Sequence, residues 1–249
     1  MTILCIESST SVCSAAICKD GEPIKQCISY EGSNHARLLP RYIEELLSFA
    51  REQGLSIEAV ALSEGPGSYT GLRIGASTAK GLCYGLNIPL IPVPTLDVLC
   101  EAARKSLCSV NEAVLIPMID ARRMEVYTAI FDSESRVESR ESKEQRVRAV
   151  VVENEESLMN EGMKELMNEG KEVYYFGDGA EKCSRIFTKP NWHFIPGIVP
   201  EAQYMGALAE QIINHKSQIT NHQSIDLAYY EPFYLKEFIA APSHVKGLN

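Results

Sequence analysis

"SEGPGSYTGLRIGASTAKGL", residues 63–82, places a glycine-rich turn between an apolar run at residues 59–62 and a segment with helical spacing. Strand, tight turn and helix in this order predict a βα unit. The turn lacks the GxxxxGK[ST] pattern of a P-loop and the GxGxxG spacing of a dinucleotide site. The stretch therefore predicts an α/β fold in which the glycines allow close packing and do not hold phosphate.

The segments around this unit repeat one order of elements. The first half predicts strands at 2–7, 12–18 and 24–30, a helix at 35–51, a strand at 59–63, a helix at 68–86, a strand at 90–93 and a helix at 95–106. The second half predicts strands at 113–119, 124–132 and 145–152, a helix at 154–168, a strand at 173–177, a helix at 180–187, a strand at 193–195 and a helix at 201–215. This indicates two duplicated βββαβαβα domains with mixed sheets.

Such a duplication is typical of the actin, hexokinase and Hsp70 (ASKHA) fold, in which each half is RNase H-like. The boundaries that it predicts are an N-terminal half-domain at 1–108, a C-terminal half-domain at 109–235 and a tail at 236–249. The aromatic segment 229–238 is expected to pack back on the body of the protein.

Composition narrows the class of protein. The apolar runs are far shorter than the ~20 residues that span a bilayer, and the first residues do not resemble a signal peptide, so we expect a cytoplasmic protein without membrane contact. The eight cysteines form no CxxC pair and lie largely in strand-like runs, which indicates buried free thiols. A net charge of −9 argues against nucleic-acid binding by this chain alone.

A nucleotide site in this fold would use the turns after the first strand of each half. The first turn reads Glu7, Ser8, Ser9, Thr10, and the second begins at Asp120 and continues with Ala121, Arg122 and Arg123. Both turns lack the glycine that lets backbone approach phosphate. The turn with Gly177 and Gly179 follows a strand, as an adenosine-side turn does. We expect at most weak nucleotide binding by Glu7, Thr10, Asp120, Gly177 and Gly179, and no resident cofactor.

Catalytic patterns are scarce. The five histidines form no HxxxH or HxxH pair, which leaves no candidate metal site, and no GxSxG elbow is present. His35, beside Ser33 and Asn34, is typical of a helix start. Two possibilities stay open: a binding subunit without catalytic residues, and an ATP-dependent small-molecule kinase or ATPase using Glu7 and Asp120. A peptidase would need a metal site that the sequence does not contain.

Five motifs carry a resemblance to a known family. They are ILCIESST at 3–10, GPGSYTGLRIG at 65–75, IPVPTLDVL at 91–99, IDARRMEVY at 119–127 and FGDGA at 176–180. Together they resemble the bacterial TsaB (YeaZ) family. The resemblance implies a non-catalytic paralogue and partner of TsaD (Kae1), the enzyme that transfers a threonylcarbamoyl group to the adenosine next to the anticodon of tRNA. It also implies a TsaE-type ATPase as a further partner, and a homodimer in isolation.

The same resemblance implies that the metal ligands of TsaD are missing. The TsaD group carries two histidines four apart on one helix, and Thr95 and Leu99 stand at the matching positions here. Leucine cannot ligate a metal ion.

The glycines of the opening stretch raise one more question. Gly71 and Gly75 share one side of the predicted helix 68–86, and each glycine costs about 1 kcal/mol relative to alanine. We expect this cost to be offset by a close helix contact. The resemblance implies that this contact is a partner-binding surface, and the alternative is packing within the chain. The residues of the predicted surface are Leu39, Tyr42, Ile43, Leu46, Gly71, Ile74, Gly75 and Thr78.

Overall fold

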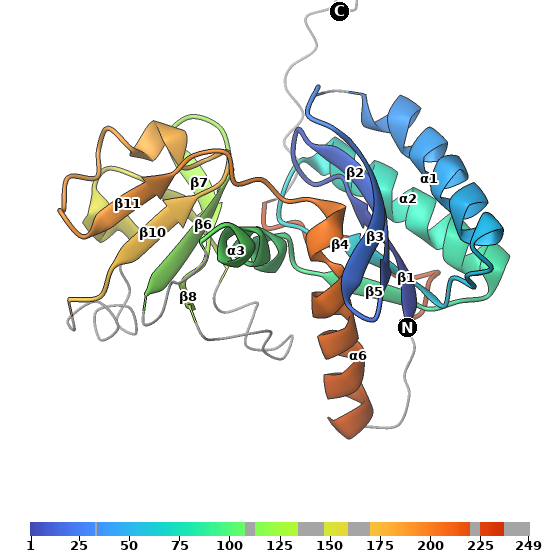
Figure 1. The fold of residues 1–249 in the computed structure, drawn as a ribbon. Helices are drawn as coiled ribbons and strands as arrows, with labels where there is room; N and C mark the ends of the chain where they lie inside the picture. The colour runs from blue at the N-terminus through green and yellow to red at the C-terminus, as the bar shows by residue number, and fades with distance from the viewer. Residues whose placement is uncertain (33, 108–112, 134–146, 159–169, 220–224, 237–249) are drawn as a thin grey trace, which may run out of the picture.

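The computed structural model describes residues 1–32, 34–107, 113–133, 147–158, 170–219 and 225–236, and contains two mixed sheets side by side (Figure 1). The first sheet has the order β3-β2-β1-β4-β5. Its strands are β1 (Thr2–Glu7), β2 (Cys13–Lys19), β3 (Glu22–Ser29), β4 (Ala59–Ser63) and β5 (Leu90–Val93). The helices in this part of the chain are α1 (His35–Glu52), α2 (Tyr69–Leu86) and α3 (Thr95–Ser106).

The second sheet repeats the first. Its order is β11-β10-β6-β7-β9, which matches β5-β4-β1-β2-β3 strand for strand. Its strands are β6 (Val114–Asp120), β7 (Glu125–Thr128), β8 (Phe131–Asp132), β9 (Arg148–Val151), β10 (Val173–Phe176) and β11 (Trp192–Ile195). Three 3₁₀ turns, η1 (Glu155–Leu158), η2 (Glu181–Cys183) and η3 (Ala202–Tyr204), precede helix α6 (Gly206–Ile219). The predicted duplicated α/β fold is confirmed.

Strand β1 is the centre of the first sheet. It pairs antiparallel with β2, with Ile3 opposite Cys18, and parallel with β4, with Ile3 opposite Ala59. All six of its residues are buried. Because successive side chains point to opposite faces, Leu4 and Ile6 pack under α1 and α2, whereas Ile3 and Cys5 face α6.

The third helix of each half covers the sheet of the other half. Leu99 of α3 packs with Leu115 and Phe176 of the second sheet, and Leu208 of α6 packs with Ile3 of the first. The domain boundary at residue 108 stays a prediction. Each sheet is covered in part by a helix from the other side of that boundary. The two domains therefore share their cores.

The second half departs from the predicted elements at three points. The strand expected at 124–132 is two strands, β7 and β8, which both pair antiparallel with β6 in one register and are separated by a break at residues 129–130. The helix expected at 180–187 is the single turn η2, closed mainly by bonds between residues three apart, as from Cys183 N to Ala180 O. The helix expected at 154–168 begins as η1, and its remainder lies outside the described residues.

The seven described cysteines are free and buried, which confirms the predicted thiols except at Cys108, which is not described. In the part of the chain that the structure describes, none of the helices has the length and apolar character needed to cross a bilayer.

The shared cores give a stability prediction. Leu208 is 2% exposed, and replacing it with alanine should lower the free energy of unfolding by about 2–5 kcal/mol through lost burial and a cavity against the first sheet. His215, exposed on the same helix, is the control, and His215→Ala should change stability little. Urea unfolding followed by circular dichroism measures both. Equal effects would contradict the packing of α6 on the first sheet.

Candidate functional site

The first hairpin turn contains a fully buried carboxyl group. Glu7 Oε1 accepts hydrogen bonds from Ser9 N at 2.7 Å and Ser9 Oγ at 2.5 Å. Glu7 Oε2 has no hydrogen-bond partner among the described residues. Burial raises the pKa of Glu7, and the hydrogen bonds from Ser9 oppose this rise only in part. Ser9 thus holds the Glu7 carboxyl group inside the protein.

The start of α2 lies directly on this turn. A Cβ added at Gly67 or Gly71 would come within 3.0 Å of the backbone oxygens of Ser9 and Ser8, respectively. A Cβ at Gly75 would come equally close to Ser8 Oγ. The contact is also hydrogen-bonded, because Ser8 Oγ donates to Gly71 O at 3.0 Å and Ser68 N donates to Ser9 O at 2.6 Å. The glycines therefore serve packing within the chain, and the helix covers the turn.

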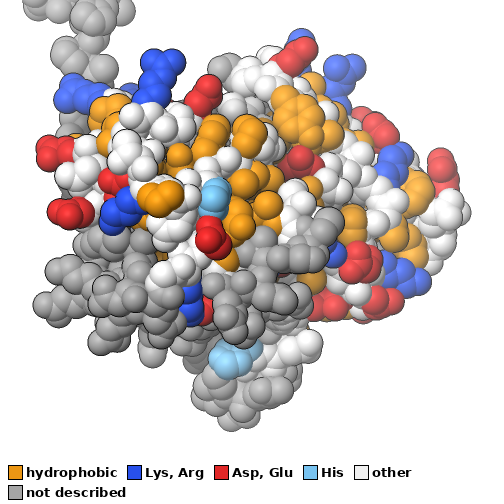
Figure 2. Space-filling model, turned by 60° about the vertical axis from the view of Figure 1, so that its left-hand side comes forward, with side chains coloured by type: hydrophobic (Ala, Val, Ile, Leu, Met, Phe, Trp, Pro, Cys, Tyr) orange, Lys and Arg blue, Asp and Glu red, His pale blue; other side chains and the backbone are white. Residues whose placement is uncertain are grey.

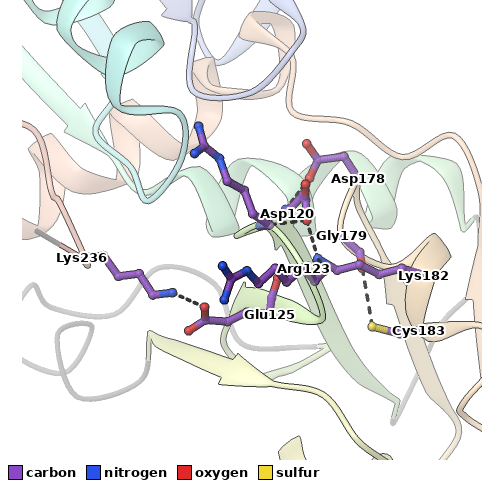
Figure 3. Close-up of polar contacts among 9 residues, drawn as sticks. Asp120, Arg123, Glu125, Asp178, Gly179, Lys182, Cys183 and Lys236 are labelled. Carbon is purple, nitrogen blue, oxygen red and sulfur yellow. Dashed lines mark hydrogen bonds and ion pairs between the residues drawn. The ribbon is translucent and has the colours of Figure 1, made fainter. Parts of the chain in front are cut away.

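The second hairpin turn is closed by a lysine (Figure 3). The Lys182 ammonium pairs with Asp120 Oδ1 and donates to the backbone oxygens of Arg123 at 2.9 Å and Glu125 at 2.7 Å. Asp178 Oδ1 accepts from Asp120 N at 2.9 Å. The positive charge at this turn is therefore supplied by the chain itself.

Gly177 and Gly179 repeat the arrangement of the first half. A Cβ at Gly177 would lie within 3.0 Å of Met118 O, and one at Gly179 equally close to the carbonyl carbon of Ile119. Gly179 N donates to Met118 O at 3.0 Å. Close backbone packing thus explains why both positions are glycine. The nucleotide role predicted for Gly177, Gly179, Asp120, Glu7 and Thr10 stays a prediction.

The predicted partner surface divides into buried and accessible residues. Leu39, Ile43 and Leu46 lie in the core under α1, and Gly71 and Gly75 face Ser8. These five residues are turned into their own chain, which corrects their assignment to an outer surface. The remaining three are partly accessible, and for them the assignment stays a prediction: Tyr42, Ile74 and Thr78.

Two glycines farther along α2 differ from Gly75. Nothing lies within 4 Å of a Cβ added at Gly81 or Gly85. Tyr84, between them, is 86% exposed, and Leu86 is 46% exposed. The outer face at the end of α2 is therefore open, carries apolar side chains and lets another backbone approach. Helical spacing found this stripe in the sequence but could not separate its covered part from its open part.

The positions that match the metal ligands of TsaD have other roles. Thr95 Oγ1 accepts from Gly65 N at 3.2 Å, and Thr95 N donates to Gly65 O at 3.0 Å, so Thr95 fixes the glycine turn. Leu99 is fully buried between α3 and the second sheet. No group of three or more potential ligands that could hold a metal ion occurs within the described ranges.

A second surface lies on β10 and β11, where hydrophobic side chains gather on the face shown in Figure 2. Tyr174 and Ile195 are only partly buried against the core beside α3. His193 Nε2 contacts Glu172 Oε2, and the ring of His193 lies 5.2 Å from that of Tyr174. Sequence reasoning did not single out this surface, because the residues come from two short strands.

The family follows from comparison of the whole chain. A family model described as "TsaD: tRNA N6-adenosine threonylcarbamoyltransferase" matches residues 30–241. A "tRNA threonylcarbamoyladenosine biosynthesis protein TsaB" from Haemophilus influenzae is 29% identical over 237 residues, which are 95% of this chain and 94% of that protein. The chain belongs to this family, in its TsaB (YeaZ) branch.

Further relatives agree with the TsaB branch. The TsaB protein of Escherichia coli is 35% identical over 132 residues, covering 53% of this chain and 55% of its own length. The solved structure of "YeaZ from Pseudomonas aeruginosa" superposes with a TM-score of 0.69 at 22% identity, over 94% of this chain and 99% of that one. That superposition supports the fold.

The covered glycines give a matched pair of predictions. Gly75→Ala should lower the free energy of unfolding by about 1–3 kcal/mol, because its Cβ meets Ser8 Oγ and Leu62. Gly81→Ala should raise it by about 1 kcal/mol, because alanine favours the helix and meets no atom. In the double variant Ser8→Ala, Gly75→Ala, the loss should be smaller than the sum of the two single losses. Urea unfolding measures all four, and a stabilised Gly75→Ala would contradict the close contact.

Glu7 gives a pH prediction. Its folded-state pKa is raised above the ordinary value of 4.5, so the folded protein binds the proton more tightly than the unfolded chain. The contribution of Glu7 to stability is present below pH 4.5 and is lost as the pH rises through the folded-state pKa. Glu7→Gln should therefore gain stability relative to the native protein as the pH rises above 4.5. Thermal melts across this range measure the difference, and a constant difference would contradict a raised pKa.

Proposed function

We propose that this chain is a non-catalytic subunit that pairs with a TsaD-type threonylcarbamoyltransferase and is required for threonylcarbamoyladenosine formation in tRNA. The observation that carries the proposal is the match to a curated TsaB protein over 95% of this chain. A role in threonylcarbamoyladenosine biosynthesis is what that relative's name states, and the paired role with TsaD agrees with the TsaD family model.

We propose that the chain has no catalytic activity because both of its hairpin turns are closed. The first is covered by α2, and its carboxyl group is turned inward to Ser9. The second is neutralised by Lys182. A kinase or ATPase would need these turns open to phosphate and to a hydrated metal ion. This arrangement does not favour the kinase alternative.

The outer face of α2 is the partner surface that the geometry supports best. It combines open glycines at 81 and 85 with the exposed side chains of Tyr84 and Leu86. A helix of a partner could approach the backbone here, and the apolar side chains would lose contact with water on association. Ile74, half-buried, extends this face toward the start of the helix. The same face would support a homodimer when TsaD is absent, and a TsaE-type ATPase would join the assembled pair.

Gly81→Glu tests the surface. The added carboxylate would be buried without a partner in the assembly, at a cost of several kcal/mol, yet it meets no atom in the isolated chain. We expect a melting temperature no lower than that of the native chain, loss of pairing with the TsaD-type enzyme in size-exclusion chromatography with light scattering, and loss of threonylcarbamoyladenosine from reconstituted reactions, measured by nucleoside mass spectrometry.

The control is Ser56→Glu, which adds the same charge at an exposed loop position before β4. It should keep both pairing and tRNA modification. Normal pairing by Gly81→Glu would contradict the outer face of α2 as the partner surface. Full modification by the TsaD-type enzyme without this chain would contradict the proposed function as a whole.

A further inference from the structure

The C-terminal strap, defined as residues 225–236, lies along α2 and forms one wall of a groove. Lys80 Nζ donates to the backbone oxygens of Ala228 and Tyr230, each at 3.2 Å, and the Tyr230 side chain is 6% exposed in the core under α1 and α2. Phe233 N donates to Glu64 O at 2.7 Å. This confirms that the aromatic segment packs back on the body of the protein, as far as residue 236. Between the strap and α2 the groove has a volume of about 490 Å³.

The groove gathers cations and tyrosines in an acidic protein. Arg73, Lys80 and Lys236 line it together with Tyr69 and Tyr234, whereas Glu231 is its single acidic residue. The whole chain carries a net charge of −9, so this positive excess is local. No carboxylate pairs with Arg73 or Lys80 among the described residues, while Lys236 pairs with Glu125.

The two aromatic rings, tilted by 43° to one another, and the arginine form a contiguous cluster. The rings of Tyr69 and Tyr234 lie 5.0 Å apart, and the Arg73 guanidinium lies 5.3 Å from the centre of the Tyr69 ring. Arg73 also donates to Tyr69 Oη at 3.0 Å, which uses one of its five N–H groups. Such a cluster offers flat faces for stacking next to charged donors for phosphate.

We propose that this groove binds a short single-stranded segment of RNA. Single strands are held by aromatic faces that stack on bases and by cations that follow the backbone, and the groove supplies both. Tyr69 and Lys80 lie about 16 Å apart along α2, at a rise of 1.5 Å per residue, which suits a strand better than one nucleotide. The inference rests on the proposed role in tRNA modification.

The groove borders the proposed partner surface on α2. Residues 69, 73, 76 and 80 recur at the three- and four-residue spacing of one helix side. Ser77, which also lines the groove, precedes Gly81 by four residues, and Tyr84 follows Lys80 at the same spacing. The expectation that this chain has no affinity for nucleic acid overlooked the groove, because its two walls are about 150 residues apart in the sequence.

The experiment is fluorescence anisotropy of a labelled single-stranded RNA 12-mer with the full chain at several salt concentrations. The two cations without a described carboxylate partner, Arg73 and Lys80, predict a slope of log affinity against log salt of about −1.4. Arg73→Gln should weaken binding at least fivefold and make the slope shallower by about 0.7. Tyr234→Leu should weaken binding at least fivefold with the slope unchanged, since it removes stacking and leaves the cations. Arg41→Gln, exposed on α1, is the matched control and should bind as the native chain does.

Several outcomes would overturn the proposal. They are no binding at low salt, equal weakening by Arg41→Gln, equal affinity for the double-stranded form of the 12-mer, and displacement of the RNA by equal concentrations of adenosine monophosphate or an oligoglutamate peptide. The assay contains no transferase. Failure here with normal TsaD pairing would reject the groove alone, whereas failure of pairing and modification would reject the proposed function.

Discussion

The approach of α2 to the first hairpin is the contact on which the site depends. Three glycines, at 67, 71 and 75, face the backbone or hydroxyl of Ser8 and Ser9 at distances that admit no side chain. Two hydrogen bonds across the same contact fix its geometry. The unfavourable helix propensity of Gly71 and Gly75 is offset inside the chain, so they need no partner to explain them. The same contact covers the turn where the fold would otherwise expose backbone to phosphate.

The second half reaches a closed hairpin by similar means. Gly177 and Gly179 bring the end of β10 against Met118 and Ile119, and Lys182 then neutralises Asp120 and caps two backbone oxygens. Duplication has therefore preserved the close backbone contact in both halves, while side chains of this chain occupy the surroundings of both turns.

Periodicity predicted the strands of the first sheet and the bounds of α1 and α2 within about two residues, because Leu39, Ile43 and Leu46 recur at helical spacing and the middle of β1 is an apolar run. Spacing states which residues share a side, but not what covers that side. Gly75 and Gly81 both lie in the predicted helix 68–86, although a Cβ would meet Ser8 at one and nothing at the other. The sequence likewise could not predict that α3 packs on the second sheet and α6 on the first, because an apolar helix face does not show which sheet it covers. The predicted helix at 180–187 is wrong, because the single turn η2 is enough to bury the few apolar residues of this segment.

Helix α2 presents three sides with three different environments. One side is closed on Ser8, one is open beside Gly81 and Gly85, and one forms the groove with the strap. The groove exists only while the strap is docked, and docking depends on Tyr230 in the first core and on Lys236 against Glu125 of the second sheet. The strap therefore ties the two domains together as well as shaping the groove. A ligand that contacts both α2 and Tyr234 would favour the docked strap, because it binds only the conformation in which both walls are present.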